Sequence, residues 1–199
     1  MATTGKAALR EQLLAARRRV ADDVRATEAE LLRDKLDALE SMVTSDTTVC
    51  AYVPVGTEPG SVELLDTLLR RSGRVLLPVA RTTAHNTPLP LSWGAYRPGT
   101  LTTGRWGLLE PPRPWLPASA LAEAGLVLVP ALAVDRGGVR LGRGRGFYDR
   151  SLCGRDPQAP LVAIVRDSEL LDEIPAGPHD VPMTHALTPR GGLIALVPR

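Results

Sequence analysis

The chain has 199 residues, of which 44% are hydrophobic and 23% are charged, a composition typical of one globular domain that argues against disorder. Its formal net charge of +2 is too small to predict a general attraction to nucleic acid or to a membrane surface. No apolar run is long enough to cross a bilayer and the first twenty residues lack the apolar core of a secretory signal, so we expect a cytoplasmic protein without a membrane partner.

Two amphipathic helices are predicted at the start of the chain. In residues 6–20, Leu9 and Leu13 fall near one face, and in residues 24–43 apolar residues recur at a spacing of three to four. The next segment, residues 48–55, reads TVCAYVPV and is apolar and rich in β-branched side chains. It predicts a buried strand.

A third helix is predicted over residues 62–71, with Ser61 as its N-cap and Gly73 as its stop. Residues 74–80 predict another strand, and residues 81–117, which are rich in Pro, Gly and Thr, predict loops and short strands. The remaining predicted elements are a short helix at 119–123 and buried strands at 126–134, 161–165 and 193–197.

Apolar runs that alternate with helices favour one class of fold. Buried strands with helices between several of them predict an α/β protein with a mainly parallel sheet covered on both faces. The sequence shows no internal repeat and no linker long enough to separate two domains. Residues 1–199 are therefore expected to form a single domain.

Residues 140–150, RLGRGRGFYDR, follow the most apolar predicted strand and precede a predicted helix start near Gly146. This order of strand, glycine-rich turn and helix binds phosphate well, because glycines let the backbone approach an anion and helix N-termini carry partial positive charge. The spacing matches neither a Walker A loop nor a dinucleotide fingerprint. Residues 136–150 contain five arginines, and their mutual repulsion favours a bound anion such as polyphosphate.

Three further side chains extend the hypothesis of a phosphate site. Asp149 follows the glycines directly and is of the type that holds Mg²⁺, which prefers carboxylate, water and phosphate oxygens. Lys6 and Arg10 lie four residues apart on one face of the first predicted helix, near its N-terminus. Cations there oppose the helix dipole, and a bound anion would reverse that penalty.

Other interpretations of the same residues stay open at this level. The cations of this chain are 22 Arg and two Lys, so an arginine-rich turn that simply faces solvent is an ordinary feature. Lys6 and Arg10 would likewise reach solvent without a ligand. A third interpretation is a nucleic-acid contact of the RG-rich kind, which the short segment and balanced net charge disfavour.

Five motifs occur in order along nearly the whole chain: KAALR at 6–10, PVGTEP at 54–59, WGLLEP at 106–111, LVPALAVDRGGVRLGRGRGFYDR at 128–150 and HDVPMT at 179–184. Together they resemble the 5-formyltetrahydrofolate cyclo-ligase family, also called methenyltetrahydrofolate synthetases. The specific part is the R-L-G-x-G-x-G-[FY]-Y-D block. The resemblance implies a Rossmann-like three-layer α/β fold related to the sugar-phosphate isomerase and CoA-transferase group.

The resemblance also implies an activity, the ATP- and Mg²⁺-dependent conversion of 5-formyltetrahydrofolate to 5,10-methenyltetrahydrofolate with release of ADP and phosphate. A formamide oxygen leaves poorly, but transfer of the γ-phosphoryl group to it gives an iminophosphate from which the folate N10 can expel phosphate. The protein would align the formyl oxygen with the γ-phosphate and neutralise charge. Its partner would be a small molecule and not nucleic acid, and a monomer is expected.

The family pattern implies a role for each matching residue. Asp149 would be the metal ligand and Arg145 the catalytic cation. The implied ATP-binding residues are Lys6, Arg10, Arg140, Leu141, Gly142, Arg143, Gly144, Arg145, Gly146, Phe147 and Tyr148. The implied substrate-binding residues are Val53, Val55, Gly56, Glu58, Arg143, Phe147 and Tyr148.

The chain departs from the family pattern at three positions: Arg145 replaces a frequent Lys, Phe147 a frequent Tyr, and Thr184 a frequent Asp. The last change questions a metal or substrate carboxylate at that position. An isomerase or transferase on the same fold stays an alternative, with Glu58 or Glu110 as its carboxylate.

The remaining polar and aromatic residues have simpler interpretations. Trp106 is either a pocket wall or core packing, and His179 with Asp180 is interpreted as a loop with local hydrogen bonds. Cys50 and Cys153 have no neighbouring cysteine and are expected to be reduced thiols, with Cys153 packed rather than nucleophilic.

Overall fold

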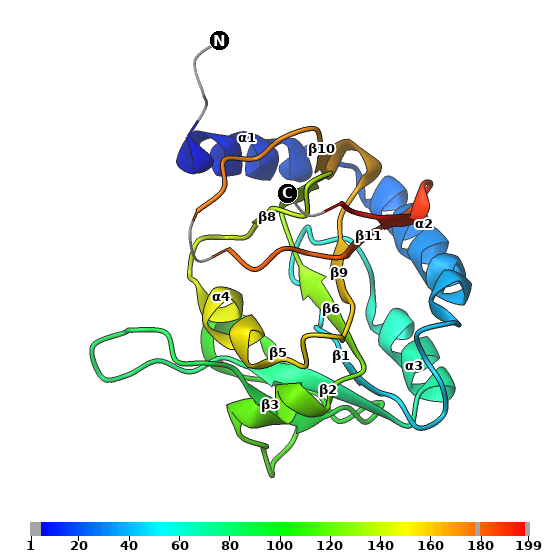
Figure 1. The fold of residues 1–199 in the computed structure, drawn as a ribbon, viewed down its shortest axis with the longest axis vertical. Coiled ribbons are helices and arrows are strands. Elements are labelled where there is room, and N and C mark those ends of the chain that lie inside the picture. The colour runs from blue at the N-terminus through cyan, green and yellow to red at the C-terminus, as the bar shows by residue number, and fades with distance from the viewer. Residues whose placement is uncertain (1–4, 178–179, 198–199) are drawn as a thin grey trace.

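The computed structural model describes residues 5–177 and 180–197, and its largest element is a sheet of seven strands (Figure 1). In spatial order these are β12 (Gly192–Ala195), β11 (His185–Thr188), β9 (Leu161–Ile164), β6 (Leu126–Pro130), β1 (Thr48–Cys50), β2 (Arg74–Val79) and β3 (Ser92–Ala95). The central strands, from β11 to β2, are parallel, and the edge strands β12 and β3 pair antiparallel with their neighbours. The predicted α/β fold with a mainly parallel sheet is confirmed.

Helices cover both faces of this sheet. The α-helices are α1 (Lys6–Arg18), α2 (Asp22–Asp34), α3 (Val62–Arg71) and α4 (Phe147–Ser151), and the 3₁₀ turns are η1 (Lys35–Leu39), η2 (Arg105–Gly107), η3 (Ala118–Glu123), η4 (Leu152–Gly154) and η5 (Asp167–Glu169). Leucines of α2, η1 and α3 pack on one face of the sheet, whereas η3, η4 and α4 lie against the other (Figure 1). None of the helices in the described part of the chain is long and apolar enough to span a bilayer.

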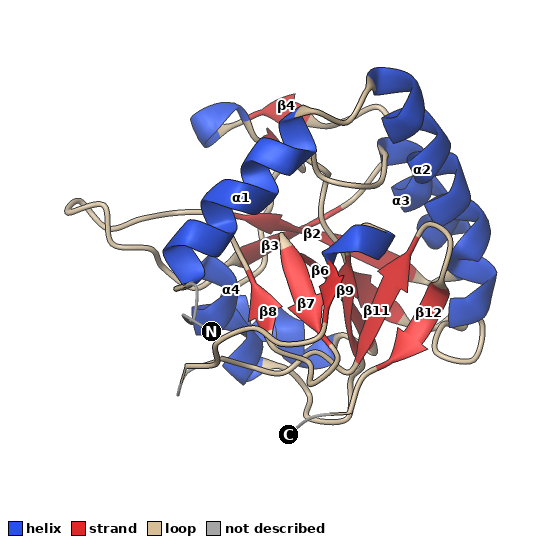
Figure 2. Ribbon diagram, turned by 90° about the horizontal axis from the view of Figure 1, so that it is seen from above, coloured by secondary structure: helices blue, strands red, loops and turns tan. Residues whose placement is uncertain are grey.

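Two smaller sheets flank the main one. They are a three-stranded sheet of β10 (Leu170–Leu171), β7 (Ala133–Asp135) and β8 (Arg140–Leu141), and a two-stranded sheet of β4 (Thr102–Thr103) and β5 (Leu109–Glu110). The α1 helix packs Leu9 and Leu13 on the three-stranded sheet, against Ala133 and Leu141 (Figure 2). This contact holds the first turns of α1 next to the segment that follows β8.

Several predicted boundaries were wrong. The predicted strand 126–134 is two strands in different sheets, because the chain leaves the main sheet after Pro130 and then pairs with β8 and β10. The predicted strand 48–55 pairs with its neighbouring strands only through Cys50, although the next three residues stay buried. The predicted helix 24–43 is α2 followed by a 3₁₀ turn. Strand β11, in the short segment HALT, was not predicted.

The order of the strands determines where a ligand can bind. Strand β1 has β2 on one side and β6 on the other. The helix that follows β1 is α3, on one face, and the helix that follows β6 is α4, on the opposite face. Chain connections that diverge in this way leave a crevice at the carboxyl ends of the two strands.

Candidate active site

A pocket of about 410 Å³ lies at this crevice. Its floor comes from the residues directly after three neighbouring strands: Tyr52 and Val53 after β1, Ala80 after β2, and Ala131 and Leu132 after β6. These residues are mostly apolar. The pocket is therefore formed where the topology predicts a ligand site.

The opposite wall is the glycine- and arginine-rich loop between β8 and α4. Gly144 and Gly146 have φ angles of 88° and 73°, in the left-handed region that favours glycine. The predicted helix start near Gly146 is confirmed, since α4 begins at Phe147. Backbone and side chains of residues 142–149 consequently face the apolar floor.

The first turns of α1 meet this loop across the pocket. Arg10 donates a hydrogen bond from Nε to the Gly142 carbonyl oxygen at 2.9 Å. Lys6 Nζ lies 2.6 Å from Asp180 Oδ2, which also accepts a bond from the Gly177 amide at 2.7 Å. The expected juxtaposition of Lys6, Arg10 and the loop is present in the structure. Asp180 therefore does more than the local bonding expected of it, while His179 lies outside the described residues.

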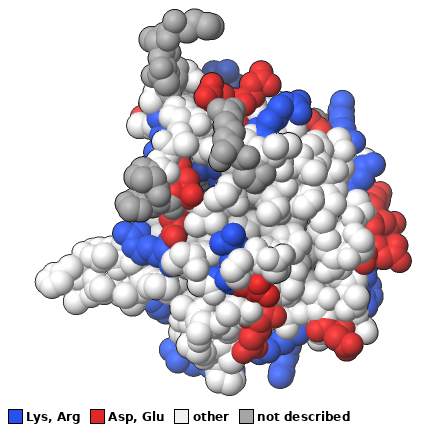
Figure 3. Space-filling model, viewed as in Figure 1, with Lys and Arg blue, Asp and Glu red and all other residues white. Residues whose placement is uncertain are grey.

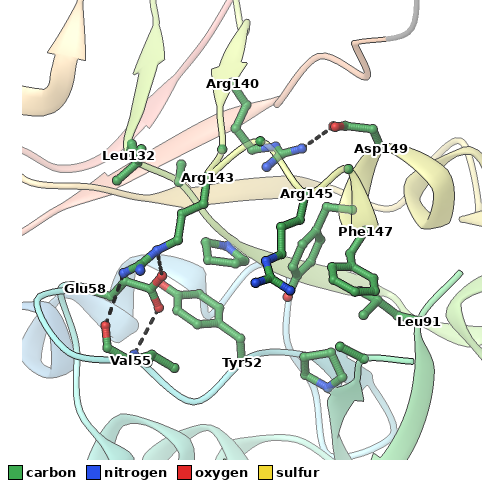
Figure 4. A pocket seen from close by; sticks show the side chains of 18 of the residues that line it. Tyr52, Val55, Glu58, Leu91, Leu132, Arg140, Arg143, Arg145, Phe147 and Asp149 are labelled. Atoms are coloured by element: carbon green, nitrogen blue, oxygen red, sulfur yellow. Dashed lines mark hydrogen bonds and ion pairs between the residues drawn. The ribbon is translucent and has the colours of Figure 1, made fainter. Parts of the chain in front are cut away.

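Glu58 places a carboxylate at the edge of the apolar floor (Figure 4). Its Oε1 accepts a bond from Arg143 Nε at 3.1 Å, and its Oε2 accepts one from the Val55 amide at 3.0 Å. The Glu58 side chain is only 10% exposed, whereas Arg143 is nearly half exposed. The carboxylate is thus fixed in place, with its polar atoms directed at the pocket.

A second ion pair joins Arg140 to Asp149 (Figure 4). The Arg140 guanidinium is buried and lies over the Tyr148 ring at 5.7 Å, whereas the Asp149 side chain is 41% exposed. Together with Arg143 and Glu58, this pair neutralises part of the arginine cluster internally. The repulsion among these arginines is therefore weaker support for a bound anion than the sequence suggested.

Trp106 forms the mouth of the pocket. It is 41% exposed and has a φ of 59°, and its ring lies 6.0 Å from that of Phe147. The guanidinium carbons of Arg145 and Arg105 lie 4.9 and 4.6 Å from its centroid. The interpretation of Trp106 as a pocket wall is confirmed, and core packing is wrong.

Two tyrosine hydroxyls at the pocket are buried without a hydrogen-bond partner among the described residues, those of Tyr52 and Tyr148. Burial raises the pKa of both phenols well above the usual value, and the negative charge of Glu58 raises them further. Both groups therefore stay protonated over the physiological pH range and are available as hydrogen-bond donors to a ligand.

This shift predicts a loss of stability in alkali. Above about pH 10 the unfolded chain ionises its tyrosines, whereas the folded chain keeps Tyr52 protonated, so the folded state binds more protons and its stability falls as pH rises. We expect wild type to lose up to about 1.4 kcal/mol per pH unit more than Tyr52→Phe above that pH. Urea unfolding of both proteins between about pH 9 and pH 11 measures the difference, and parallel profiles would contradict it.

A buried ionic network connects the pocket floor to the first two helices. Arg17, on α1, donates from Nε and Nη2 to the Glu169 carboxylate at 2.7 Å each, and Nη2 also reaches the Ala131 carbonyl oxygen at 2.7 Å. Arg166 donates to Glu28 Oε2 at 2.7 Å and to the Thr57 carbonyl oxygen at 3.0 Å. Two segments that line or adjoin the pocket are thereby tied to α1 and α2.

Most residues that the sequence implied for the site line one pocket. Leu141 and Gly56 do not; Leu141 is buried beneath α1. Sequence reasoning did not assign Tyr52, Asp180 or the apolar wall to the site. That wall consists of Pro78, Ala80, Leu91, Leu108, Leu109, Pro130, Ala131 and Leu132.

Other candidates lie away from the pocket. Glu110 is buried in a two-bond ion pair with Arg81, at 2.7 and 2.8 Å, so it is not the carboxylate of an alternative reaction at this site. Thr184 Oγ1 forms hydrogen bonds with the backbone of Leu161 at the amino end of β9, whereas the pocket lies at the carboxyl ends of the strands. Both cysteines are free, as expected, but Cys153 is exposed and not packed.

Comparisons with known proteins agree on one family. The model of the 5-formyltetrahydrofolate cyclo-ligase family matches residues 2–189. The chain is 60% identical to the 5-formyltetrahydrofolate cyclo-ligase of Mycolicibacterium smegmatis over 196 residues, which cover 98% of this chain and 100% of that protein.

Two solved structures share the fold. The 5,10-methenyltetrahydrofolate synthetase of Aquifex aeolicus matches with a TM-score of 0.76 and 22% identity, covering 96% of this chain and 92% of that one. The synthetase of Mycoplasma pneumoniae matches with a TM-score of 0.69 and 20% identity, covering 90% and 96%.

Proposed function

The chain belongs to the 5-formyltetrahydrofolate cyclo-ligase family, and on this premise we propose that its pocket converts 5-formyltetrahydrofolate to 5,10-methenyltetrahydrofolate at the expense of ATP. One observation carries the proposal. Lys6 and Arg10 of α1 meet the arginine loop, residues 142–146, at the same pocket that Glu58 lines. One half of the pocket suits a triphosphate, and the other suits a flat heterocycle.

The basic half is proposed to bind ATP. Lys6 and Arg10 reach it from α1, and Arg145 reaches it from the loop. Gly144 supports this role, because a Cβ at that position would lie 3.5 Å from Arg10 and fill space between the two segments. Charge-assisted hydrogen bonds from cations on two separate elements would hold a phosphate chain in a defined direction.

The apolar half is proposed to bind the folate. Val53 and Val55 line it where the chain leaves β1, and Phe147 and Trp106 enclose the mouth. Glu58 is an acceptor for N–H groups of the pterin ring, since a carboxylate accepts but does not donate. Each ligand would occupy its own half, with the loop between them.

In the proposed reaction the formyl oxygen attacks the γ-phosphorus and the bond to ADP breaks, which gives an iminophosphate on the folate. N10 then adds to the activated carbon and gives up its proton to solvent, and the phosphate leaves, so the ring closes with release of ADP and phosphate. The chain's own residues align the two ligands and neutralise charge on the transferred group, with Arg145 as the loop cation proposed for that task.

Magnesium fits the residues present at this site. The described residues include no cluster of three or more His, Cys, Asp or Glu side chains that would cage a metal. A single half-exposed carboxylate at the pocket, that of Asp149, suits an ion that takes most of its ligands from phosphate oxygens and water. When bound, the ion would neutralise phosphate charge, and Asp149 would be the residue that holds it.

We further propose that residues 1–199 act as one cytoplasmic domain with a Rossmann-like three-layer fold, and that it works as a monomer. The residues implied for both ligands meet within a single chain, so the proposed site needs no side chain from a second copy. On the face shown in Figure 3, basic and acidic side chains are interspersed, which favours a small-molecule ligand over a nucleic acid.

The direct test is turnover by the purified chain. We expect 5-formyltetrahydrofolate, ATP and Mg²⁺ together to give methenyltetrahydrofolate absorbance, with one ADP and one phosphate released per product. Omission of the folate is the control and should suppress ATP hydrolysis. A folded protein that forms no product, or that hydrolyses ATP regardless of folate, would refute the proposal.

Replacement of the loop cation gives a graded prediction. Arg145→Ala should raise the KM for ATP about tenfold, because a charged hydrogen bond to a phosphate is worth at least about 1.5 kcal/mol. Arg145→Lys should lose less, since it keeps the charge. Arg105→Ala is the matched control, because Arg105 also lies over the Trp106 ring but does not line the pocket. Equal KM values for ATP in both alanine variants would contradict the assignment.

A further inference from the structure

The geometry points to Tyr52 as a folate-recognition residue whose hydroxyl donates a hydrogen bond to the pterin carbonyl oxygen beside Glu58. This inference rests on the proposed function, because it names a contact within the folate half of that pocket. Tyr52 lies outside all five family motifs of the sequence. Its position comes from the early end of β1, after which the buried chain continues along the pocket floor.

The first observation is a buried donor without an acceptor. Tyr52 is only 6% exposed, and its hydroxyl oxygen has no hydrogen-bond partner in the described part of the chain. Buried polar groups are nearly always hydrogen-bonded, and one left unpaired in a pocket is most simply paired by the ligand. In Figure 4 the Tyr52 ring points toward the Glu58 carboxylate.

Comparison with the other tyrosines separates those at the pocket from the one outside it. The chain has three tyrosines. Tyr96, outside the pocket, donates to Asp66 Oδ1 at 2.7 Å. Tyr148 is unpaired like Tyr52, but it lies against Arg140 at the loop and so on the phosphate side. Among the tyrosines, the two with unpaired hydroxyls are therefore the two that line the pocket, and Tyr52 is the one on its folate floor.

Chemical complementarity identifies the contact. The Glu58 carboxylate accepts hydrogen bonds, whereas the Tyr52 phenol, kept protonated by burial, donates one. A 2-amino-4-oxo pterin presents N–H donors next to a carbonyl acceptor on one edge of the ring. An adjacent acceptor and donor in the protein match that edge, and they would reject a ring whose carbonyl is replaced by an amino group.

The test compares Tyr52→Phe with Tyr96→Phe, a matched control that also loses one hydroxyl. Binding of 5-formyltetrahydrofolate is measured by calorimetry with a non-hydrolysable ATP analogue, and turnover is measured in parallel. We expect Tyr52→Phe to weaken folate binding about tenfold, equivalent to about 1.4 kcal/mol, with the KM for ATP within about twofold of wild type. Its melting temperature without ligand should not fall, because an unpaired group has been removed. Tyr96→Phe should melt lower and bind folate normally.

A second ligand makes the test specific. Wild type should prefer the 4-oxo substrate over its 4-amino analogue, and Tyr52→Phe should lose about tenfold of that preference. Unchanged folate affinity or unchanged preference in Tyr52→Phe overturns the inference. A melting temperature lowered as in Tyr96→Phe also overturns it, because it would show that the Tyr52 hydroxyl bonds to another group of the protein. If wild type binds folate but does not turn it over, the proposed reaction fails while this contact is still decided by the binding data. If wild type binds no folate, both fail.

Discussion

Asp149→Asn is expected to lower kcat at least about 10³-fold while the chain stays folded. The substitution keeps the shape of the side chain but removes the charge that is proposed to hold Mg²⁺ at the phosphates. Loss of about 4 kcal/mol of transition-state stabilisation corresponds to this factor. Steady-state rates at saturating ATP and folate measure the effect, and circular dichroism checks the fold.

The matched control for this prediction is Asp172→Asn. Asp172 also pairs with an arginine of the same segment, since its Oδ1 lies 3.6 Å from Arg136 Nε, but its side chain is fully exposed and does not line the pocket. It should keep wild-type kcat. If Asp149→Asn reached the wild-type rate at the same Mg²⁺ concentration, Asp149 would not be the metal ligand, and its ion pair with Arg140 would be structural.

The helices could be predicted because their signal is local. In α3, four of the ten residues of VELLDTLLRR are buried, Leu64, Leu65, Thr67 and Leu68, at helical spacing between polar ones. The arginine loop was found for the same reason, since glycines, cations and an acid occur within eleven consecutive residues. Where the pattern lies in one continuous segment, the sequence identified the element, whereas the phosphate chemistry assigned to the loop stays a prediction.

The errors occur where distant partners decide the structure. The apolar run 126–134 reads as one strand, but β8 and β10 provide pairing for its second half in another sheet. Strand β11 is short, and β9 and β12 define it from both sides. No local pattern in either segment contains that information.

The same limit applies to the site. Asp180 looks like an ordinary loop acid until it meets Lys6, which is 174 residues away in the sequence. Tyr52 looks like part of a buried strand until β1 ends before it. The carboxyl ends of the predicted strands were the available signal for the apolar wall, because side chains that follow neighbouring parallel strands meet at one edge of the sheet.

Arg17→Met is expected to destabilise the fold by about 3 kcal/mol. Arg17 is 1% exposed, and it supplies two bonds to Glu169 and one to the Ala131 carbonyl oxygen. Methionine fills similar space but leaves Glu169 as a buried carboxylate with one partner fewer, and loss of one member of a buried pair typically costs about 3–5 kcal/mol. The lower end applies because Glu169 still accepts a bond from the Arg166 amide at 2.9 Å. Urea unfolding at neutral pH measures the change.

The matched control is Arg33→Met, because Arg33 is a half-exposed arginine of α2 whose Nε lies 4.0 Å from Asp34 Oδ1. An exposed pair of this kind contributes at most about 1 kcal/mol, so the two substitutions should differ clearly. Arg17→Met should also raise the KM for folate, since the Ala131 carbonyl that it releases belongs to the pocket floor. A stability loss no larger than that of Arg33→Met would mean that Glu169 is satisfied by Arg166 alone, and that the apolar contacts of α1, the Arg10 bond and the Lys6–Asp180 ion pair hold the helix to the pocket without Arg17.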